Sequence, residues 1–150
     1  MLTFEEVSPE IAPMHLLLEA DPSEKCIKDY LRDAWCFVAR DQDDIVGVCI
    51  AKEIKAGISE IFNIAVDPAV QAQGIGKRLL TFTLSCLKDK QFKSVELGTG
   101  SFGYQLAFYQ RQGFRVESII KDFFIDHYDE PVFENGIQHK DMLRLACDLS

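Results

Sequence analysis

The sequence predicts a mixed α/β fold, and three observations lead to this prediction. Segments rich in β-branched residues alternate with segments whose apolar residues recur at helical spacing. The 150 residues are the length of one ordinary domain, and no repeat, low-complexity tract or flexible linker divides them. We therefore expect a single domain over residues 1–150, in the order strand, two helices, three strands, helix, strand, helix and two strands.

Two helices are expected near the N-terminus. Ser8 is placed to cap the first, with Pro9 at its first helical position, and this helix would continue through Glu19. The segment 21–23 (Asp-Pro-Ser) breaks it, and Ser23 can cap a second helix that ends near Asp33.

Three strands separated by turns are expected next, because β-branched and aromatic residues are frequent there. They span residues 35–39, 45–54 and 58–66. Asp67-Pro68 ends the third strand, since proline cannot donate to a strand ladder.

The second half of the chain is expected to continue the alternation. Leu79, Leu80, Thr83, Leu84 and Leu87 recur at helical spacing and predict a long amphipathic helix. The later elements are a strand at 94–97, a loop at 98–100, a helix at 104–112 closed by Gly113, strands at 114–125 and 142–149, and a polar stretch at 126–135 that ends in an Asn135-Gly136 turn.

Composition and charge exclude several kinds of partner. A formal net charge of −8 argues against a nucleic-acid surface and mildly favours a cationic small molecule. No apolar run approaches the roughly 20 residues that span a bilayer, so no membrane partner is expected. Acidic residues at the N-terminus and five cysteines without a C-x-x-C pair favour a reducing, cytoplasmic location. The three histidines are scattered, so no metal site is expected.

The segment from Ile64 to Arg78 is the most informative part of the chain, because a glycine-rich loop follows a strand and opens a helix. Gly74 and Gly76 let the backbone approach a ligand closely. The first N–H groups of a helix lack internal partners and suit phosphates, and Lys77 and Arg78 add positive charge. A tight turn without a ligand is the alternative. Neither the Rossmann nor the Walker spacing of glycines is present.

Spelled as Q-x-x-G-x-G, Gln71, Gly74 and Gly76 resemble the CoA-binding signature of the GNAT superfamily. Residues 108–114 (Phe-Tyr-Gln-Arg-Gln-Gly-Phe) resemble its later L-Y-x-x-x-G-F element, and together the two motifs anchor a resemblance over residues 34–149. Gly98-Thr99-Gly100, Tyr109 and the segment 134–136 are similar to the YvbK-like acetyltransferases, a bacterial subgroup.

The resemblance implies a GNAT-type mixed sheet, mostly antiparallel, of about seven strands with a splayed parallel pair and about four flanking helices. It also implies acetyl-CoA as the cosubstrate, without a metal. Backbone N–H groups of the glycine loop would hold the pyrophosphate, the preceding strand would pair with the pantetheine arm, and the Val66 N–H would bind the developing oxyanion. The expected cofactor-binding residues are Ile64, Ala65, Val66, Gln71, Ala72, Gln73, Gly74, Ile75, Gly76, Lys77, Arg78 and Ser101.

The chain departs from the family pattern at one point. Many members have an asparagine seven residues before the tyrosine and an alanine four residues before it, where this chain has Phe102 and Gln105. Ser101 or Gln105 would then supply the polar contact to the pantetheine.

Two catalytic residues are expected from the resemblance. Tyr109 occupies the position of the general acid, with a packed aromatic residue as the alternative. Glu60 lies six residues before Val66, where histone-acetylating members carry a catalytic base; a solvated carboxylate with a water chain as the base is the alternative. By strand alternation Glu60 shares a face with Phe62 and, if no bulge intervenes, with Ile64.

The expected function is transfer of an acetyl group from acetyl-CoA to a primary amine of a small molecule or peptide, by direct attack in a ternary complex. The acids of residues 126–130 and Glu134 would suit a polyamine or another cationic amine, although a solvated loop is the alternative. Another acyl-CoA or an oxygen acceptor would keep the same fold. A non-catalytic CoA-binding sensor or interaction module is the other class considered, and the resemblance also implies a possible homodimer.

Overall fold

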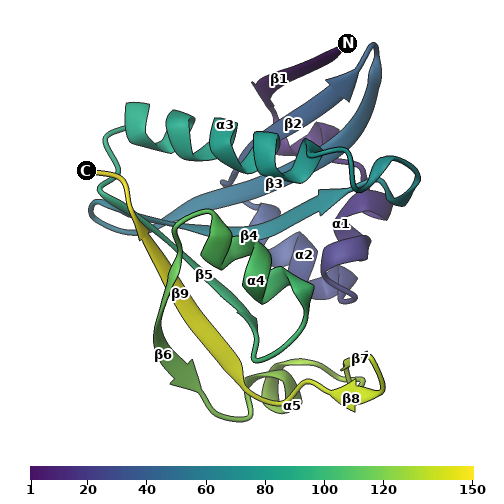
Figure 1. The fold of residues 1–150 in the computed structure, drawn as a ribbon, viewed down its shortest axis with the longest axis vertical. Helices are drawn as coiled ribbons and strands as arrows, with labels where there is room; N and C mark the ends of the chain where they lie inside the picture. Colours follow the sequence, from purple (N-terminus) through teal and green to yellow (C-terminus); the bar gives the residue numbers. More distant parts are fainter.

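The computed structural model describes residues 1–150, and a seven-stranded sheet lies at its centre (Figure 1). The strand order is β1-β2-β3-β4-β5-β9-β6, and a separate hairpin is formed by β7 and β8. The strands are β1 (Leu2–Val7), β2 (Trp35–Asp41), β3 (Asp44–Lys55), β4 (Ile58–Val66), β5 (Ser94–Gly100), β6 (Arg115–Ile120), β7 (Phe133–Glu134), β8 (Ile137–Gln138) and β9 (Met142–Asp148). Only β4 and β5 run parallel; the other neighbours in both sheets are antiparallel.

Helices cover both faces of the large sheet, and each face has its own core. They are α1 (Met14–Ala20), α2 (Glu24–Leu31), α3 (Ile75–Asp89), α4 (Tyr104–Arg111) and α5 (Phe123–His127), with short 3-10 helices at Pro9–Ile11 and Pro68–Val70. Alternation along β3 separates the cores: Cys49 joins the cluster under α3 and α4, whereas Val48 joins the cluster under α1 and α2. None of these helices has the length and hydrophobicity that a membrane-spanning helix needs.

The parallel pair β4–β5 is short and then opens. Only residues 58–60 of β4 pair with residues 94–96 of β5. Beyond this point β5 keeps β9 as its partner over its whole length, while the C-terminal half of β4 pairs only with β3. Figure 1 shows β4 and β5 diverging toward their C-terminal ends. The divergence leaves the main chain at the end of β4 without a strand on one side.

A bulge in β4 changes which side chains share a face. Ile50 pairs with Asn63 but the next residue, Ala51, pairs with Ile61, so Phe62 is the extra residue. Ile61 and Ile64 therefore lie in the same core cluster, under α3 and α4. The sequence placed Glu60 and Ile64 on the same face of the strand only if no bulge intervened. The bulge reverses the alternation between them, so the two side chains do not share a face.

Three elements differ from the sequence prediction. The first α-helix begins at Met14, not Pro9, because Pro13 forces the preceding residue into an extended conformation (Ala12 ψ 122°). The strand predicted at 94–97 continues through the predicted loop to Gly100, since β9 pairs with all of it. The strand predicted at 114–125 ends at Ile120, and Asp122, with φ +61°, turns the chain into α5.

Other expectations are confirmed, among them the mixed, mostly antiparallel sheet with one splayed parallel pair; five α-helices flank it rather than about four. The Ser23 hydroxyl accepts the Cys26 N–H at 3.1 Å and caps α2. Gly113 follows α4 with φ +98°. Asn135 and Gly136, with φ +54° and +77°, form the turn between β7 and β8.

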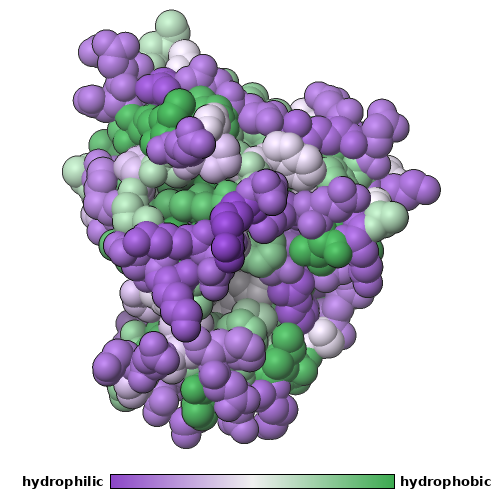
Figure 2. Space-filling model, turned by 180° about the vertical axis from the view of Figure 1, so that it is seen from behind, coloured by the Kyte–Doolittle hydropathy of each residue, from purple (hydrophilic) through white to green (hydrophobic).

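The outer surface is mostly hydrophilic on the side seen from behind (Figure 2). On the face opposite to Figure 1, hydrophilic residues predominate and hydrophobic patches are scattered among them (Figure 2). Exposed large apolar side chains include Ile119 on β6 and Phe133 and Ile137 in the hairpin.

Candidate active site

The loop between β4 and α3 is held in place by short polar contacts. The Asp67 carboxylate accepts the Ala69 N–H at 2.9 Å, and the Gln71 side-chain amide donates to the Val66 carbonyl at 3.0 Å. Ala72 and Gly74 have left-handed backbone conformations, with φ +67° and +76°. The loop therefore leads into α3 in one defined path.

The beginning of α3 offers free backbone donors. The first helical bond runs from the Arg78 N–H to the Gly74 carbonyl at 3.1 Å, so the N–H groups of Ile75, Gly76 and Lys77 lack helical acceptors. They sit at the positive end of a 15-residue helix. A Cβ added at Gly74 would meet nothing within 4 Å, so the loop is open beside this residue. These features fit the phosphates of a nucleotide cofactor.

The main chain at the end of β4 faces the gap beside β5. The Asp67 N–H donates to the Val46 carbonyl at 2.8 Å, which makes this pair a hydrogen-bonded one. In the observed register Val66 lies opposite Gly47 and Ile64 opposite Cys49. Hydrogen-bonded and non-hydrogen-bonded pairs alternate in an antiparallel ladder, so Ile64 and Val66 are in non-hydrogen-bonded pairs with β3. Their N–H groups therefore point away from β3 and into the gap.

A cavity of about 550 Å³, here called the loop cavity, occupies this gap between the glycine loop and α4. Nine of the expected cofactor-binding residues line it: Ile64, Ala65, Val66, Gln71, Ala72, Gly74, Ile75, Gly76 and Lys77.

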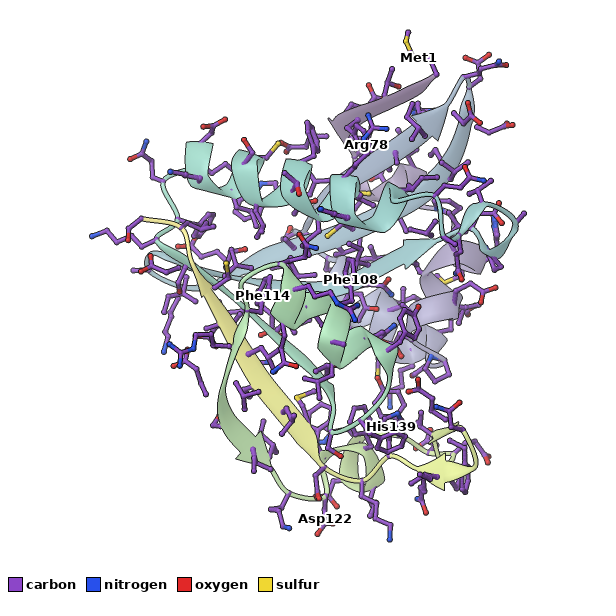
Figure 3. All side chains as sticks on the ribbon, viewed as in Figure 1. Met1, Arg78, Phe108, Phe114, Asp122 and His139 are labelled. Atoms are coloured by element: carbon purple, nitrogen blue, oxygen red, sulfur yellow. The ribbon has the colours of Figure 1, made fainter.

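The other three expected residues lie outside the loop cavity. Gln73 and Ser101 are exposed and do not line it, whereas Gln105, the alternative to Ser101, does. Arg78 points from α3 toward β1, where its guanidinium lies 5.1 Å from the Phe4 ring centroid (Figure 3). The structure thus brings together the loop backbone and the end of β4, but directs Arg78 elsewhere.

Tyr109 lines the loop cavity from α4 and is also a core residue. Its side chain packs against Phe108 and Phe114, and only 7% of the residue is exposed. Burial, with smaller effects from Cys49 and Tyr104, raises the pKa of the Tyr109 phenol well above its usual value of about 10. The phenol is therefore protonated at neutral pH and available as a proton donor.

A second cavity, of about 910 Å³, lies between the α1–α2 segment and the C-terminal part of the chain. Eight aromatic residues line it: Tyr30, Phe62, Phe102, Tyr104, Phe123, Phe124, Tyr128 and Phe133. Six carboxylates also line it, from Glu19, Asp21, Asp29, Glu60, Asp129 and Glu134. The two cavities share four residues, here called the junction: Glu19, Ala20, Tyr104 and Gln105.

Glu60 lines only the second cavity and is held by Arg144 on β9. The guanidinium donates to both carboxylate oxygens, at 3.0 and 2.9 Å, and a further 3.1 Å bond reaches Glu96. Both side chains are mostly buried, with 14% of Glu60 and 18% of Arg144 exposed. The bond to Glu60 is the main reason why the pKa of Arg144 is raised above its usual value. The pair is a strong bidentate contact on the wall of the cavity.

A polar network that the sequence did not reveal closes the side of the second cavity near α2. The buried Asp21 carboxylate accepts hydrogen bonds from Tyr30 (3.1 Å), Tyr128 (3.0 Å) and the Ser23 N–H (3.1 Å). Burial and the neighbouring Asp21 raise the pKa of both tyrosines. Asp21 and Tyr128 are 107 residues apart, so no local pattern could have indicated that they meet.

A second unexpected pair lies at the far end of this cavity, where Figure 3 shows His139 beside the β7–β8 hairpin. Its Nε2 lies 2.8 Å from the Glu134 carboxylate, and its ring stacks on Phe102 with centroids 4.1 Å apart. A Cβ added at Gly100 would overlap the His139 ring, and one at Gly103 would approach Glu134 to 2.6 Å. Gly100 lies inside β5, and a glycine inside a strand marks such a close approach, which was the available sequence signal.

A glycine loop that opens a helix beside a diverging parallel pair suits a phosphate-bearing cofactor, and comparison with known proteins identifies the family. Residues 32–116, more than half of the chain, match the family described as Acetyltransferase (GNAT) domain. The chain belongs to this family.

Whole-chain relatives share both sequence and fold. The chain is 41% identical over 146 residues, 97% of its length and 93% of the relative's, to the uncharacterized N-acetyltransferase YvbK of Bacillus subtilis (strain 168). It is 40% identical to an IAA acetyltransferase from Bacillus cereus ATCC 14579, with a TM-score of 0.93 and 99% of both chains covered. A GNAT family acetyltransferase from Elizabethkingia anophelis with acetyl-CoA bound has 38% identity and a TM-score of 0.93, covering 98% of this chain and 97% of that one. The resemblance to the GNAT superfamily and to the YvbK-like subgroup is confirmed.

Gly100→Ala tests the packing of the Glu134–His139 pair. The new methyl group would overlap the histidine ring, so we expect the free energy of unfolding to fall by about 1–3 kcal/mol. In a His139→Ala background the same substitution should cost less than about 0.5 kcal/mol, because the ring is gone. Urea unfolding of the four proteins of this cycle measures the coupling. An equal cost in both backgrounds would show that the ring and the glycine are not in contact.

Proposed function

We propose that the protein transfers an acetyl group from acetyl-CoA to a primary amine of a small molecule or peptide, by direct attack in a ternary complex. The observation that carries the proposal is the junction, where a phosphate-suited loop cavity and a larger acidic, aromatic cavity share four lining residues. A donor in the first cavity and an acceptor in the second would meet there. A relative holding acetyl-CoA and the family itself support the choice of donor.

On the donor side, backbone groups do most of the binding. The free N–H groups at the start of α3, with Lys77 beside them, would hold the pyrophosphate. The Ile64 N–H would pair with the pantetheine arm, as a missing β-strand would, which leaves the Val66 N–H for the thioester. Gln105, which lines both cavities, takes the polar role considered for Ser101.

The reaction requires stabilisation of charge at one atom and movement of two protons. Bound acetyl-CoA supplies a thioester carbonyl, whose carbon bonds to the amine nitrogen while the bond to sulfur breaks. The Val66 N–H would donate to the carbonyl oxygen as negative charge develops there. Tyr109 would give its phenolic proton to the departing sulfur, since burial keeps the phenol protonated at neutral pH by raising its pKa.

The amine must also lose a proton, and the sequence left Glu60 and a water chain as candidate acceptors. Both oxygens of Glu60 accept from Arg144, and Glu60 is absent from the junction. We therefore favour water in the second cavity as the route for this proton, with Glu60 anchoring Arg144.

The alternative is a non-catalytic CoA-binding sensor of the same fold. Such a protein would bind acetyl-CoA without releasing free thiol, and it would have no need for a protonated phenol in the loop cavity. Another acyl-CoA or an oxygen acceptor stays open within the same site. The homodimer and the cytoplasmic location expected from the sequence stay predictions.

Tyr109→Phe tests the general acid. We expect kcat to fall about 10²–10³-fold while the acetyl-CoA Kd changes less than about threefold, because the ring and its packing are retained. Stopped-flow measurement of thiol release and calorimetry of cofactor binding separate the two effects. Tyr104→Phe removes a more exposed hydroxyl from the same helix and should cost less than about tenfold.

The pH profile gives a further check on Tyr109. Only the protonated phenol can donate, and its pKa is raised, so wild-type kcat should show no alkaline loss from this group below about pH 10. A Tyr109→Phe enzyme of unchanged kcat would remove Tyr109 from the mechanism.

Glu60→Gln distinguishes an anchor from a base. We expect the free energy of unfolding to fall by about 1–3 kcal/mol, because Arg144 loses its bidentate partner, and kcat to fall less than about tenfold. Glu96→Gln is the control, because Glu96 accepts only one hydrogen bond from Arg144 and lines neither cavity. This substitution should cost less stability. A loss of kcat of about 100-fold or more in Glu60→Gln alone, with stability retained, would restore Glu60 as the base.

A further inference from the structure

Glu19 is the one ionisable carboxylate at the junction. It lies in the last turn of α1, is exposed, and lines both cavities together with Ala20, Tyr104 and Gln105. None of the other three carries a carboxylate or an ammonium group. A charge at Glu19 therefore acts where donor and acceptor would meet.

Most of the other acids in the second cavity are already engaged. Asp21 accepts three hydrogen bonds, and Glu60 is held by Arg144. Asp29 pairs with Arg32 at 3.1 Å, and Glu134 contacts His139. Glu19 and Asp129 have no hydrogen-bond or ion-pair partner in the structure, and Asp129 lines only the second cavity. Glu19 is thus the free carboxylate at the point of transfer.

The surrounding backbone adds negative character at the same place. Helix α1 ends here, and its last internal bond is from the Asp21 N–H to the Leu17 carbonyl. Pro22 has no N–H to donate to the Leu18 carbonyl, and the Ser23 N–H donates to the Asp21 side chain instead of to the Glu19 carbonyl. Carbonyl groups without helical partners are the negative end of the helix dipole and attract cations.

None of the cations that line the two cavities forms an ion pair with Glu19, including Lys77 and Arg111 of the loop cavity. Arg144 is paired with Glu60 and Glu96. Lys25 is exposed on α2 and lines the second cavity but not the loop cavity. The eight aromatic residues of the wall suit an apolar or cationic body attached to the amine.

We propose that Glu19 binds the ammonium group of the acceptor at the junction, and that the acceptor is an alkyl or arylalkyl primary amine without a neighbouring carboxylate. This inference rests on the proposed acetyl transfer. Glu19 holds the ammonium form next to the donor cavity, and the proton passes to water before attack. An acceptor with a carboxylate beside its amine would place that carboxylate against Glu19.

The test compares the wild-type protein with Glu19→Gln and Glu10→Gln. Glu10 is exposed, lines neither cavity and has no ion-pair partner, so its substitution is matched in charge and type. The probes are 1,4-diaminobutane, 2-phenylethylamine and glycine, with thiol release measured at saturating acetyl-CoA. Binding of the same probes to the CoA-bound protein is measured by calorimetry.

We expect the two amines to be bound and acetylated in preference to glycine. Glu19→Gln should raise the acceptor KM and Kd roughly tenfold, with kcat changed less than about threefold and the acetyl-CoA Kd within about twofold. Glu10→Gln should behave as wild type.

Unchanged acceptor KM and Kd in Glu19→Gln, glycine as the preferred acceptor, or no binding of either amine to the wild type would each overturn the inference. Binding that depends on Glu19 without thiol release would instead uphold the Glu19 site and reject the proposed transfer.

Discussion

The divergence of β4 from β5 is the constraint on which the site depends. Three residue pairs hold the strands together, and then β5 stays with β9 while β4 continues with β3 alone. The N–H groups of Ile64 and Val66 are left facing a gap, and α3 begins at one side of this gap with further unpaired N–H groups. An unpaired backbone donor is costly in a dry interior, so such a gap suits a ligand that presents acceptors along its length.

The two cavities differ in the charge of the groups that line them. The loop cavity takes its positive character from backbone donors and Lys77, so an acidic protein can still hold a phosphate group. Six carboxylates line the second cavity, and three of them are held by its other side chains: Asp21 by Tyr30 and Tyr128, Glu60 by Arg144, and Glu134 by His139. The Asp21–Tyr128 and Glu60–Arg144 contacts join segments 107 and 84 residues apart in the sequence.

The motif-bearing part of the site was predictable because it is local. Gln71, Gly74 and Gly76 lie close together in the chain, and their spacing at the start of a helix indicates by itself a loop that suits phosphates. The second cavity was predictable only in part. Asp129 and Glu134 belong to the stretch expected on the acceptor side, but nothing local indicated that Asp21, near the N-terminus, would line the same cavity as His139 and Arg144. The bulge at Phe62 is also invisible in the sequence, yet it separates Glu60 from Ile64. A residue close to a motif in sequence need not belong to the site: Arg78 is adjacent to the loop, but its side chain extends from α3 toward Phe4.

Acetyl transfer to an amine is tested by measuring the release of free CoA thiol from acetyl-CoA, with and without a panel of primary amines. The protein used is one whose acetyl-CoA binding has been confirmed by calorimetry. We expect release to depend on the amine and the acetylated amine to accumulate in equal amount. Tight acetyl-CoA binding with no amine-dependent release across alkyl amines, arylalkyl amines and peptides would contradict it and indicate a CoA-binding sensor.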